Sequence, residues 1–241
     1  MEIYSGFARV YDDFMDAPYE EWADYIEGLW AENKPRLVLD LACGTGSMIE
    51  ILAARGYDMI GVDISSEMLA IARRKSPDVL LLNQDMRELE LYGTVDAILC
   101  LCDSLNYILE PTELAQVFAL VANYLNPGGL FIFDINSEYK FREVLADNNF
   151  SHVEDESAYI WENFYDEDSR LNEYHSTFFI KQGENYIRHE EVHIQRAYSA
   201  QEIKDALKGA GLTLLGEFEE LSHSPPREAS ERIFFVAKKS D

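Results

Sequence analysis

The chain has 241 residues, of which 45 are Asp or Glu and 20 are Lys or Arg, so its formal net charge is −25. Proteins that bind nucleic acids or anionic membranes neutralise phosphates with clustered basic side chains, so this composition disfavours both kinds of partner. Because 47% of the residues are hydrophobic and 12% aromatic, the chain has enough apolar surface to form a buried core. We expect one compact domain over residues 1–241.

The hydrophobic segments and the cysteines indicate a reduced, cytoplasmic protein. No apolar run approaches the roughly 20 residues needed to cross a bilayer, and the N-terminus lacks the basic and apolar regions of a signal peptide. The chain has an odd number of cysteines, namely Cys43, Cys100 and Cys102. Their spacing resembles neither a disulfide framework nor a paired zinc site. We expect no metal, and the sequence does not indicate an oligomeric state.

Helices and buried strands alternate over the first 140 residues. Apolar residues at helical spacing predict a first helix over 18–32. Short apolar runs, separated by helical segments, follow at 37–41, 59–63, 79–82, 95–101 and 130–134. Strands that are apolar throughout are buried on both faces, so this alternation predicts a parallel sheet covered by helices on both sides.

The last hundred residues have a different pattern. Three segments with strand character, 159–165, 171–180 and 186–198, are joined by short polar turns that are typical of antiparallel hairpins. Ser199 and Glu202 form a capping box that opens a helix ending at Gly211, and two final strands are expected at 212–218 and 232–237.

Together these elements predict an α/β fold with a doubly wound, mostly parallel, seven-stranded Rossmann-like sheet. Its core spans about 34–148 and 199–241. An N-terminal lid helix occupies about 1–33, and an antiparallel β-meander is inserted at about 150–198.

A glycine-rich turn follows the first strand. The strand carries Asp40 near its end, and Gly44 and Gly46 allow a ligand to approach the backbone before the next helix begins. The turn has no lysine, which a phosphate-binding P-loop requires, and Ile49 occupies the place of the third glycine in a nicotinamide fingerprint. A tight turn without a ligand is the alternative.

Two further acids end the second and third strands. Asp63, 23 residues after Asp40, can accept hydrogen bonds from the vicinal hydroxyls of a ribose. Asp85 can accept from an adenine amino group, and Met86 offers a flexible apolar surface to the ring. Each acid alone could be a helix cap, but three acids in this order favour a cofactor that contains a nucleoside.

These motifs resemble those of class I S-adenosylmethionine-dependent methyltransferases. The resemblance rests on Asp40-Leu-Ala-Cys-Gly-Thr-Gly46, Val62-Asp63, Gln84-Asp85-Met86 and Leu125-Asn-Pro-Gly-Gly-Leu130, and it is closest over residues 1–140. It implies S-adenosylmethionine as the cofactor. The family's first loop glycine is Ala42 here, a common variant.

The resemblance also assigns the cofactor contacts. The turn from Ala42 to Gly46 would hold the methionyl part, and residues around Cys102 would lie beside its amino acid end. Asp63 would bind the ribose, and Asp85 and Met86 the adenine. Ile64 and Met68 complete the expected set.

The N-terminal segment Phe7-Ala-Arg-Val-Tyr11-Asp12 resembles the opening of many small-molecule members of this family, where a Tyr-Asp pair covers the cofactor. An aromatic face beside the sulfonium would stabilise it by about 1–2 kcal/mol. Tyr11 is the first candidate, ahead of Tyr4 and Trp22. The alternative is that these aromatic residues only pack the first helix onto the core.

Methyl transfer from a sulfonium needs mainly in-line positioning and the exclusion of water. A hydroxyl or thiol acceptor would also need a base, whereas a neutral amine can attack directly. Asp103, Asn106 and Tyr107 follow the fourth strand, and we select Asp103 together with Tyr11 as catalytic candidates. Hydrogen bonding within the loop is the alternative, and it is favoured for Asn106.

His189, Glu191 and His193 share one face of a strand, at a spacing that could bind a metal. We favour the alternative of a polar face turned to solvent, since the opposite face carries Tyr186, Val192 and Ile194. His175 on the preceding strand fits either interpretation.

The sequence therefore predicts methyl transfer from S-adenosylmethionine to nitrogen or oxygen of a small-molecule acceptor. Three alternatives remain open. One is a regulatory protein that binds the cofactor without turnover, and another is a methyltransferase acting on RNA or protein. The third is a nucleotide-sugar or NAD enzyme of similar fold.

Overall fold

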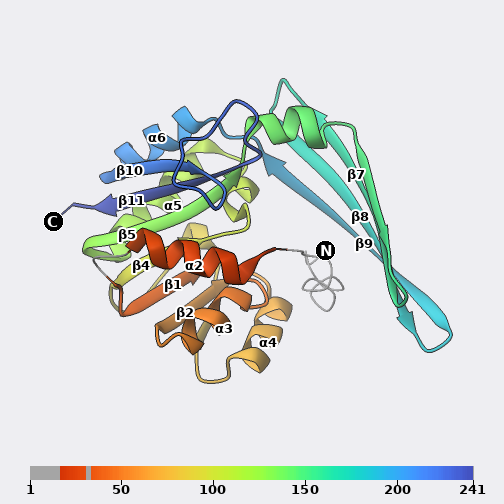
Figure 1. Cartoon of the computed structure of the whole chain (residues 1–241), viewed down its shortest axis with the longest axis horizontal. Coiled ribbons are helices and arrows are strands. Elements are labelled where there is room, and N and C mark those ends of the chain that lie inside the picture. The colour runs from red at the N-terminus through yellow and green to blue at the C-terminus, as the bar shows by residue number, and fades with distance from the viewer. Residues whose placement is uncertain (1–16, 31–33, 241) are drawn as a thin grey trace.

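A seven-stranded sheet lies at the centre of the computed structural model, which describes residues 17–30 and 34–240. The strand order is β3-β2-β1-β4-β5-β11-β10, and β11 runs antiparallel to both of its neighbours (Figure 1). The strands are β1 (Leu37–Leu41), β2 (Asp58–Asp63), β3 (Leu80–Asn83), β4 (Val95–Cys100), β5 (Leu125–Asn136), β10 (Leu212–Glu219) and β11 (Arg232–Lys239). The prediction of a doubly wound, mostly parallel, seven-stranded sheet is confirmed.

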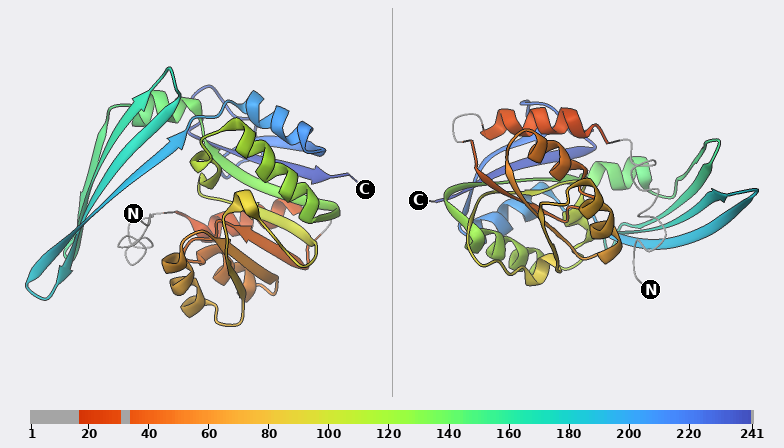
Figure 2. Two further views of the ribbon diagram at one scale, coloured as in Figure 1. Left: turned by 180° about the vertical axis from the view of Figure 1, so that it is seen from behind. Right: turned by 90° about the horizontal axis from the view of Figure 1, so that it is seen from below.

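Helices cover both faces of this sheet (Figure 2). Alternate strand residues supply two cores: Leu39 and Phe133 pack with residues of α5 (Pro111–Tyr124) and α6 (Ala200–Gly209). Val38 and Ile132 pack on the other face with residues of α2 (Tyr19–Trp30), α3 (Ser47–Ala54) and α4 (Ser66–Lys75). Both faces are apolar because both are covered. Among the described residues, no helix has the length and hydrophobicity needed to cross a membrane.

Short helical turns complete the core. They are η2 (Met86–Glu88) after β3, η3 (Ser104–Tyr107) after β4 and η4 (Lys140–Leu145) after β5. The first two follow strands whose carboxyl ends lie at one edge of the sheet, which is where parallel α/β sheets bind ligands.

A second sheet, which we call the meander, has the strands β6 (Asn149–Val153), β7 (Ser157–Asp166), β8 (Leu171–Gln182) and β9 (Asn185–Arg196). Neighbouring strands are antiparallel, and the sheet projects from the α/β core as a long arm (Figures 1 and 2). The sequence predicted three strands, and the structure adds β6. Most β6 side chains are exposed, so the strand lacks the apolar alternation that would have identified it.

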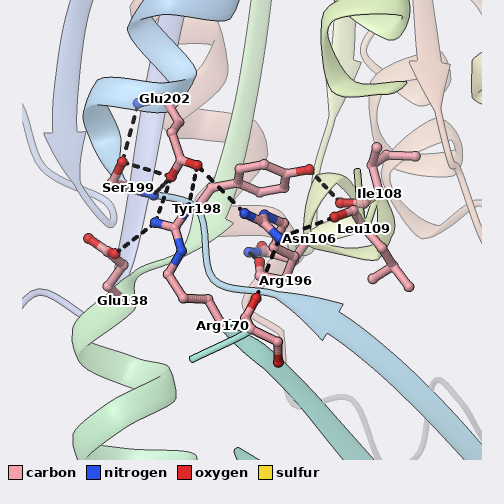
Figure 3. Close-up of polar contacts among 10 residues, drawn as sticks. Asn106, Ile108, Leu109, Glu138, Arg170, Arg196, Tyr198, Ser199 and Glu202 are labelled. Carbon is pink, nitrogen blue, oxygen red and sulfur yellow. Dashed lines mark hydrogen bonds and ion pairs between the residues drawn. The ribbon is translucent and has the colours of Figure 1, made fainter. Parts of the chain in front are cut away.

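Glu202 fastens the base of the meander to helix α6 (Figure 3). Its carboxylate completes the predicted capping box with Ser199 and also accepts hydrogen bonds from Arg170 at distances of 2.9 and 2.5 Å. Arg196, at the end of β9, lies 3.8 Å from the same carboxylate. Burial alone would raise the pKa of Glu202, but the hydrogen bonds from Arg170 and Ser199 outweigh burial and lower it to about 2.

Asn106 and Tyr198 hold the same junction from the side of η3 (Figure 3). The Asn106 amide donates to the backbone oxygen of Arg196 at 2.8 Å, and its own oxygen accepts from the Asn136 N–H at 2.9 Å. The Tyr198 hydroxyl donates to the Ile108 carbonyl at 2.6 Å. The meander, the loop after β4 and the end of β5 are therefore fixed to one another by buried hydrogen bonds.

We expect Glu202→Gln to destabilise the protein at neutral pH by about 2 kcal/mol. Because the folded-state pKa of Glu202 is below its ordinary value of 4.5, this stabilisation is present above pH 4.5 and is lost as the pH falls toward 2. Urea unfolding at pH 7 and at pH 3 measures it. Asp205→Asn, at an exposed position of the same helix, is the control. An equal effect at both pH values would contradict the assignment.

Candidate active site

The carboxyl edge of the main sheet brings together the acids that the sequence placed at strand ends. Asp40 lies opposite Gly61 in the β1–β2 ladder, and Asp63 lies opposite Asn83 in the β2–β3 ladder. Asp85 follows β3 and caps η2. The three predicted acids therefore lie at or just after the carboxyl ends of adjacent strands, in the order β1, β2 and β3.

The turn after β1 is built from residues with left-handed backbone. Ala42, Gly44 and Gly46 have φ values of 64°, 54° and 77°. A Cβ on Gly46 would come within 2.8 Å of the Ala72 Cβ, so this glycine lets α3 pack closely on α4. A Cβ on Gly44 would meet no atom within 4 Å. Gly44 is therefore the position at which a ligand can approach the backbone.

Asp63 ties the end of β2 to this turn. One carboxylate oxygen accepts from the Gly44 N–H and the other from the Ser65 N–H, each at 2.8 Å. Burial raises the pKa of Asp63, while the N–H groups of Ser65, Gly44 and Ile64 oppose the rise. A carboxylate oxygen accepts more than one hydrogen bond, so both oxygens retain acceptor capacity.

Asp40 is 3% exposed and lies close enough to Asp63 for their charges to interact. Burial, and then the charge of Asp63, raise the pKa of Asp40 to about 7. Within the described part of the chain, no group donates a hydrogen bond to its carboxyl. The site therefore contains a buried acceptor that a cationic ligand group would satisfy.

Asp85 is held as an anion by Arg87. The guanidinium Nη2 lies 2.6 Å from one carboxylate oxygen, and the backbone N–H of Arg87 donates to the other at 2.9 Å. Hydrogen bonding to Arg87 lowers the pKa of Asp85. Arg87 is in turn anchored to Glu113 of α5 at 2.9 Å. These contacts fix the position of the Asp85 carboxylate. Binding of adenine by Asp85 stays a prediction.

The apolar residues predicted to contact the cofactor differ in exposure. Ile64 is 62% exposed beside Asp63, and Met86 is partly buried after β3. Both offer surface at the sheet edge. Met68 is 2% exposed, which leaves little of its side chain for a ligand.

The loop after β4 also has left-handed backbone, with φ values of 58° at Cys102 and 50° at Asp103. Non-glycine residues in this region store strain and cluster at functional sites. The Cys102 thiol lies 3.9 Å from the Tyr19 hydroxyl, and burial raises its pKa. Cys102 therefore stands as a neutral thiol at the predicted methionyl end.

Asp103, predicted as a catalytic candidate, is locked by its neighbours. One carboxylate oxygen pairs with the Arg232 guanidinium at 2.8 Å, and the other accepts from the Gln195 amide at 2.7 Å. Its backbone N–H donates to Asp134 at 2.9 Å. These bonds join β4 to β5, β9 and β11, so Asp103 has a clear positioning role, and a direct catalytic role stays a prediction.

Sequence reasoning missed Asp134, Arg232 and Gln195. Asp134 ends the fifth apolar run, so the rule that found the other acids could also have found it. It is fully buried, ion-paired with Arg232, and burial raises its pKa. Arg232 lies 129 positions from Asp103 along the chain, and no local pattern indicates their contact.

The structure corrects the prediction that the polar face of β9 is turned to solvent. Glu191, His193 and Gln195 are buried, whereas Val192 and Ile194 on the opposite face are 49% and 38% exposed. The polar side of this strand therefore faces inward. His175 lies on the outward side, 2.7 Å from Glu173. No set of three metal-ligating side chains occurs in residues 17–30 and 34–240.

The inward side chains of β9 meet η3. His193 Nδ1 lies 3.4 Å from the Tyr107 hydroxyl, and His193 Nε2 lies 3.1 Å from the Glu191 carboxylate. The Tyr107 hydroxyl also contacts that of Tyr174, whose ring stacks on His193 with centroids 4.8 Å apart. The polar groups of the meander thus reach the loop that follows β4.

The remaining predictions concern three aromatic residues near the cofactor. Tyr11 and Tyr4 lie outside the described residues. Trp22 is 2% exposed and packs edge-on against Phe234, with ring centroids 5.6 Å apart. Trp22 therefore belongs to the core, as the alternative interpretation held.

A cavity of about 480 Å³ lies elsewhere, between α4 and β3. Its lining includes Leu69, Arg73, Leu81 and Asn83 but none of the acids at the strand ends. Its walls are mainly apolar, so we assign neither the cofactor nor its acceptor to it.

Comparisons with known proteins identify the family. A methyltransferase domain family matches residues 38–129. A solved S-adenosylmethionine-dependent methyltransferase from Clostridium acetobutylicum ATCC 824 is 36% identical, with a TM-score of 0.91 and coverage of 99% of both chains. YqeM of Bacillus subtilis (strain 168) is 40% identical over 243 residues, which is 99% of this chain and 98% of that protein.

A more distant relative has a named substrate. The dTDP-3-amino-3,4,6-trideoxy-alpha-D-glucopyranose N,N-dimethyltransferase of Streptomyces venezuelae is 32% identical over 145 residues, which cover 58% of this chain and 60% of that one.

The fold and the matches place this chain in one class: it belongs to the class I S-adenosylmethionine-dependent methyltransferases. The predicted family, fold class and cofactor are confirmed. The described residues also fit this cofactor. Gly44 leaves room for the cofactor to approach the backbone, and Ile64 exposes apolar surface beside Asp63. The Asp40 carboxyl accepts no hydrogen bond from the described residues and is free to accept one from the cofactor.

We expect Asp40→Asn to change how stability depends on pH. Because burial raises the carboxyl pKa to about 7, the wild-type protein loses stability as pH rises from about 4 to 7, when only the unfolded state ionises freely. The variant has no carboxyl to ionise. Its free energy of unfolding relative to that of wild type should therefore rise by about 2–4 kcal/mol from pH 5 to pH 8. Urea unfolding measures the difference. A gain that does not vary with pH would contradict the assignment.

We expect Asp63→Asn to weaken binding of S-adenosylhomocysteine by about 10- to 100-fold, since hydrogen bonds to a charged acceptor are worth roughly 1.5–3 kcal/mol. Isothermal titration calorimetry on the folded variant measures this. Asp58→Asn, at the exposed other end of β2, is the matched control and should bind like wild type. Unchanged affinity in Asp63→Asn would refute the ribose assignment.

Proposed function

We propose that this chain transfers the methyl group of S-adenosylmethionine to an amine of a small, polar acceptor. The acceptor would bind between the loop after β4 and the inward face of the meander. The observation that carries this proposal is the buried polar side of β9, where Glu191, His193 and Gln195 face inward. Buried polar groups are costly unless they have partners, so this face is built for polar contacts.

The cofactor edge and the polar face adjoin at η3. Asp103 precedes η3 and binds Gln195 of β9, while Tyr107 ends η3 and contacts His193 of β9. A nucleophile bound beside Tyr107 would therefore lie next to the methionyl end of the cofactor site, near Cys102. When bound, the cofactor supplies an activated methyl group on a sulfonium sulfur.

The chain's own residues supply position. Asp63 would hold the ribose, Asp85 and Met86 the adenine, and the Gly44 turn the methionyl part, so that the methyl carbon is fixed. The meander would cover the acceptor and exclude water, which leaves the nucleophile in line with the methyl group. Tyr11, which lies outside the described residues, remains our candidate for the sulfonium contact.

An amine is favoured over other nucleophiles by two findings. The Streptomyces venezuelae relative is named as an N,N-dimethyltransferase of an amino sugar nucleotide. The net charge of −25 also attracts simple cationic amines and increases their rate of association, although it repels the diphosphate of a dTDP-linked sugar.

We expect the purified full-length chain to transfer labelled methyl from S-adenosylmethionine to a dTDP-linked amino sugar or another small amine, with equimolar S-adenosylhomocysteine as the second product. The hydroxyl analogue of each amine is the matched control and should accept at least tenfold less label. Scintillation counting after chromatography measures both.

Two outcomes would contradict the proposal. Label that enters only the RNA or protein fraction of a cell extract would indicate a macromolecular acceptor. Calorimetric binding of S-adenosylhomocysteine without transfer to any fraction would indicate a cofactor-binding regulator.

A further inference from the structure

We propose that Tyr107, His193 and Glu191 form a proton-accepting relay at the acceptor site. This inference rests on the proposed function, since it concerns the proton that the acceptor loses. It explains the buried His-Glu pair of β9, which the cofactor site does not use.

The three groups form a chain of hydrogen bonds that runs from Tyr107 through His193 to Glu191. Glu191 lies 3.1 Å from His193 Nε2, and Tyr107 Oη lies 3.4 Å from His193 Nδ1. A carboxylate on Nε2 favours the proton on that nitrogen, which leaves Nδ1 as an acceptor for the Tyr107 hydroxyl. The geometry therefore gives a carboxylate–imidazole–phenol chain, in which the carboxylate fixes the tautomer of the base.

The surroundings keep the relay in place and shield it from water. His193 and Glu191 are 2% and 8% exposed, and the ring of His193 stacks on Tyr174 of β8. Among the described residues, the titratable groups that contact the imidazole are Tyr107 from η3, Tyr174 from β8 and Glu191 from its own strand. Tyr107 is partly exposed, and of the three groups it lies nearest in the chain to the carboxyl end of β4.

The position of Tyr107 connects the relay with the reaction. Tyr107 ends η3, which begins directly after the left-handed residues Cys102 and Asp103 at the carboxyl end of β4. Asp103 and Gln195 join this loop to β9 at 2.7 Å, two residues from His193. The phenol therefore lies between the cofactor edge and the meander, where the nucleophile is expected.

The proton transfer balances without an additional reactant. The amine nitrogen forms a bond to the methyl carbon as the carbon–sulfur bond breaks, and that electron pair remains on sulfur, which becomes neutral. The acceptor arrives as an ammonium ion, whose nitrogen has no free electron pair until a proton leaves it for Tyr107 Oη while the Tyr107 proton moves to His193 Nδ1. The neutral amine formed in this way is the nucleophile. The resulting imidazolium is stabilised by Glu191 and returns its proton to solvent after product release.

The first test needs no acceptor. Histidine labelled with ¹⁵N in the full-length protein, bound to S-adenosylhomocysteine, reports by NMR which ring nitrogen of His193 carries the proton. His193→Gln assigns the signals. We expect the Nε2-protonated tautomer, with a clear change in both ring nitrogen shifts in Glu191→Gln. A neutral ring protonated on Nδ1, or shifts unchanged by Glu191→Gln, would overturn the relay.

The second test uses the acceptor that the wild-type protein methylates. His193→Gln and Tyr107→Phe should each lower kcat by about 100-fold, with KM for S-adenosylmethionine within twofold of wild type. A solvent deuterium isotope effect on kcat of wild type, which reports the proton transfer, should disappear in His193→Gln. A kcat within threefold of wild type, or an unchanged solvent isotope effect, would also overturn the relay.

The chain offers a matched control. Glu173 and His175 form a similar pair, two residues apart on β8 and 2.7 Å from each other, but on the outward side of the meander. His175→Gln should leave kcat and its solvent isotope effect unchanged. If the wild-type chain methylates no amine, the proposed function fails, and the His193 tautomer still decides the relay independently.

Discussion

The paired charges of Asp103 and Arg232 hold the active site together. An arginine that is 11% exposed in its side chain would be very costly without a partner, and here it binds Asp103 at 2.8 Å and also Asp134. The other carboxylate oxygen of Asp103 accepts a hydrogen bond from the Gln195 amide. A single carboxylate thus fixes the end of β4 against the last strand of the core and against the meander.

The parts of this site that follow local rules could be predicted from the sequence. Asp40, Asp63 and Asp85 were found because each directly ends or follows a buried strand, and parallel strands share one edge. The seven-stranded sheet followed from apolar runs in the same way. Arg232 could not be found, since its role depends on two acids that are distant in the chain and on a strand order that no local pattern specifies.

Strand β9 shows a second limit of sequence reasoning. Alternation divides its residues into a polar and an apolar face, but it does not tell which face is buried. The usual choice buries the apolar face, and here the structure buries Glu191 and His193 and exposes Val192. The usual rule fails because the buried polar side chains have polar partners of their own, such as Asp103 for Gln195 and Tyr107 for His193. A reversed face of this kind is therefore informative about function.

The contacts of Glu202, Asp103 and Tyr107 hold the meander to the core near one end of β9. His193 lies three residues from the end of β9 at Arg196, about 10 Å along the strand, whereas the hairpin at Gly183 lies about 40 Å away. A given rotation about the base displaces the hairpin roughly four times as far as it displaces His193. Under the proposed function, substitutions near the far end would change the space for different acceptors while the residues close to the base keep their alignment.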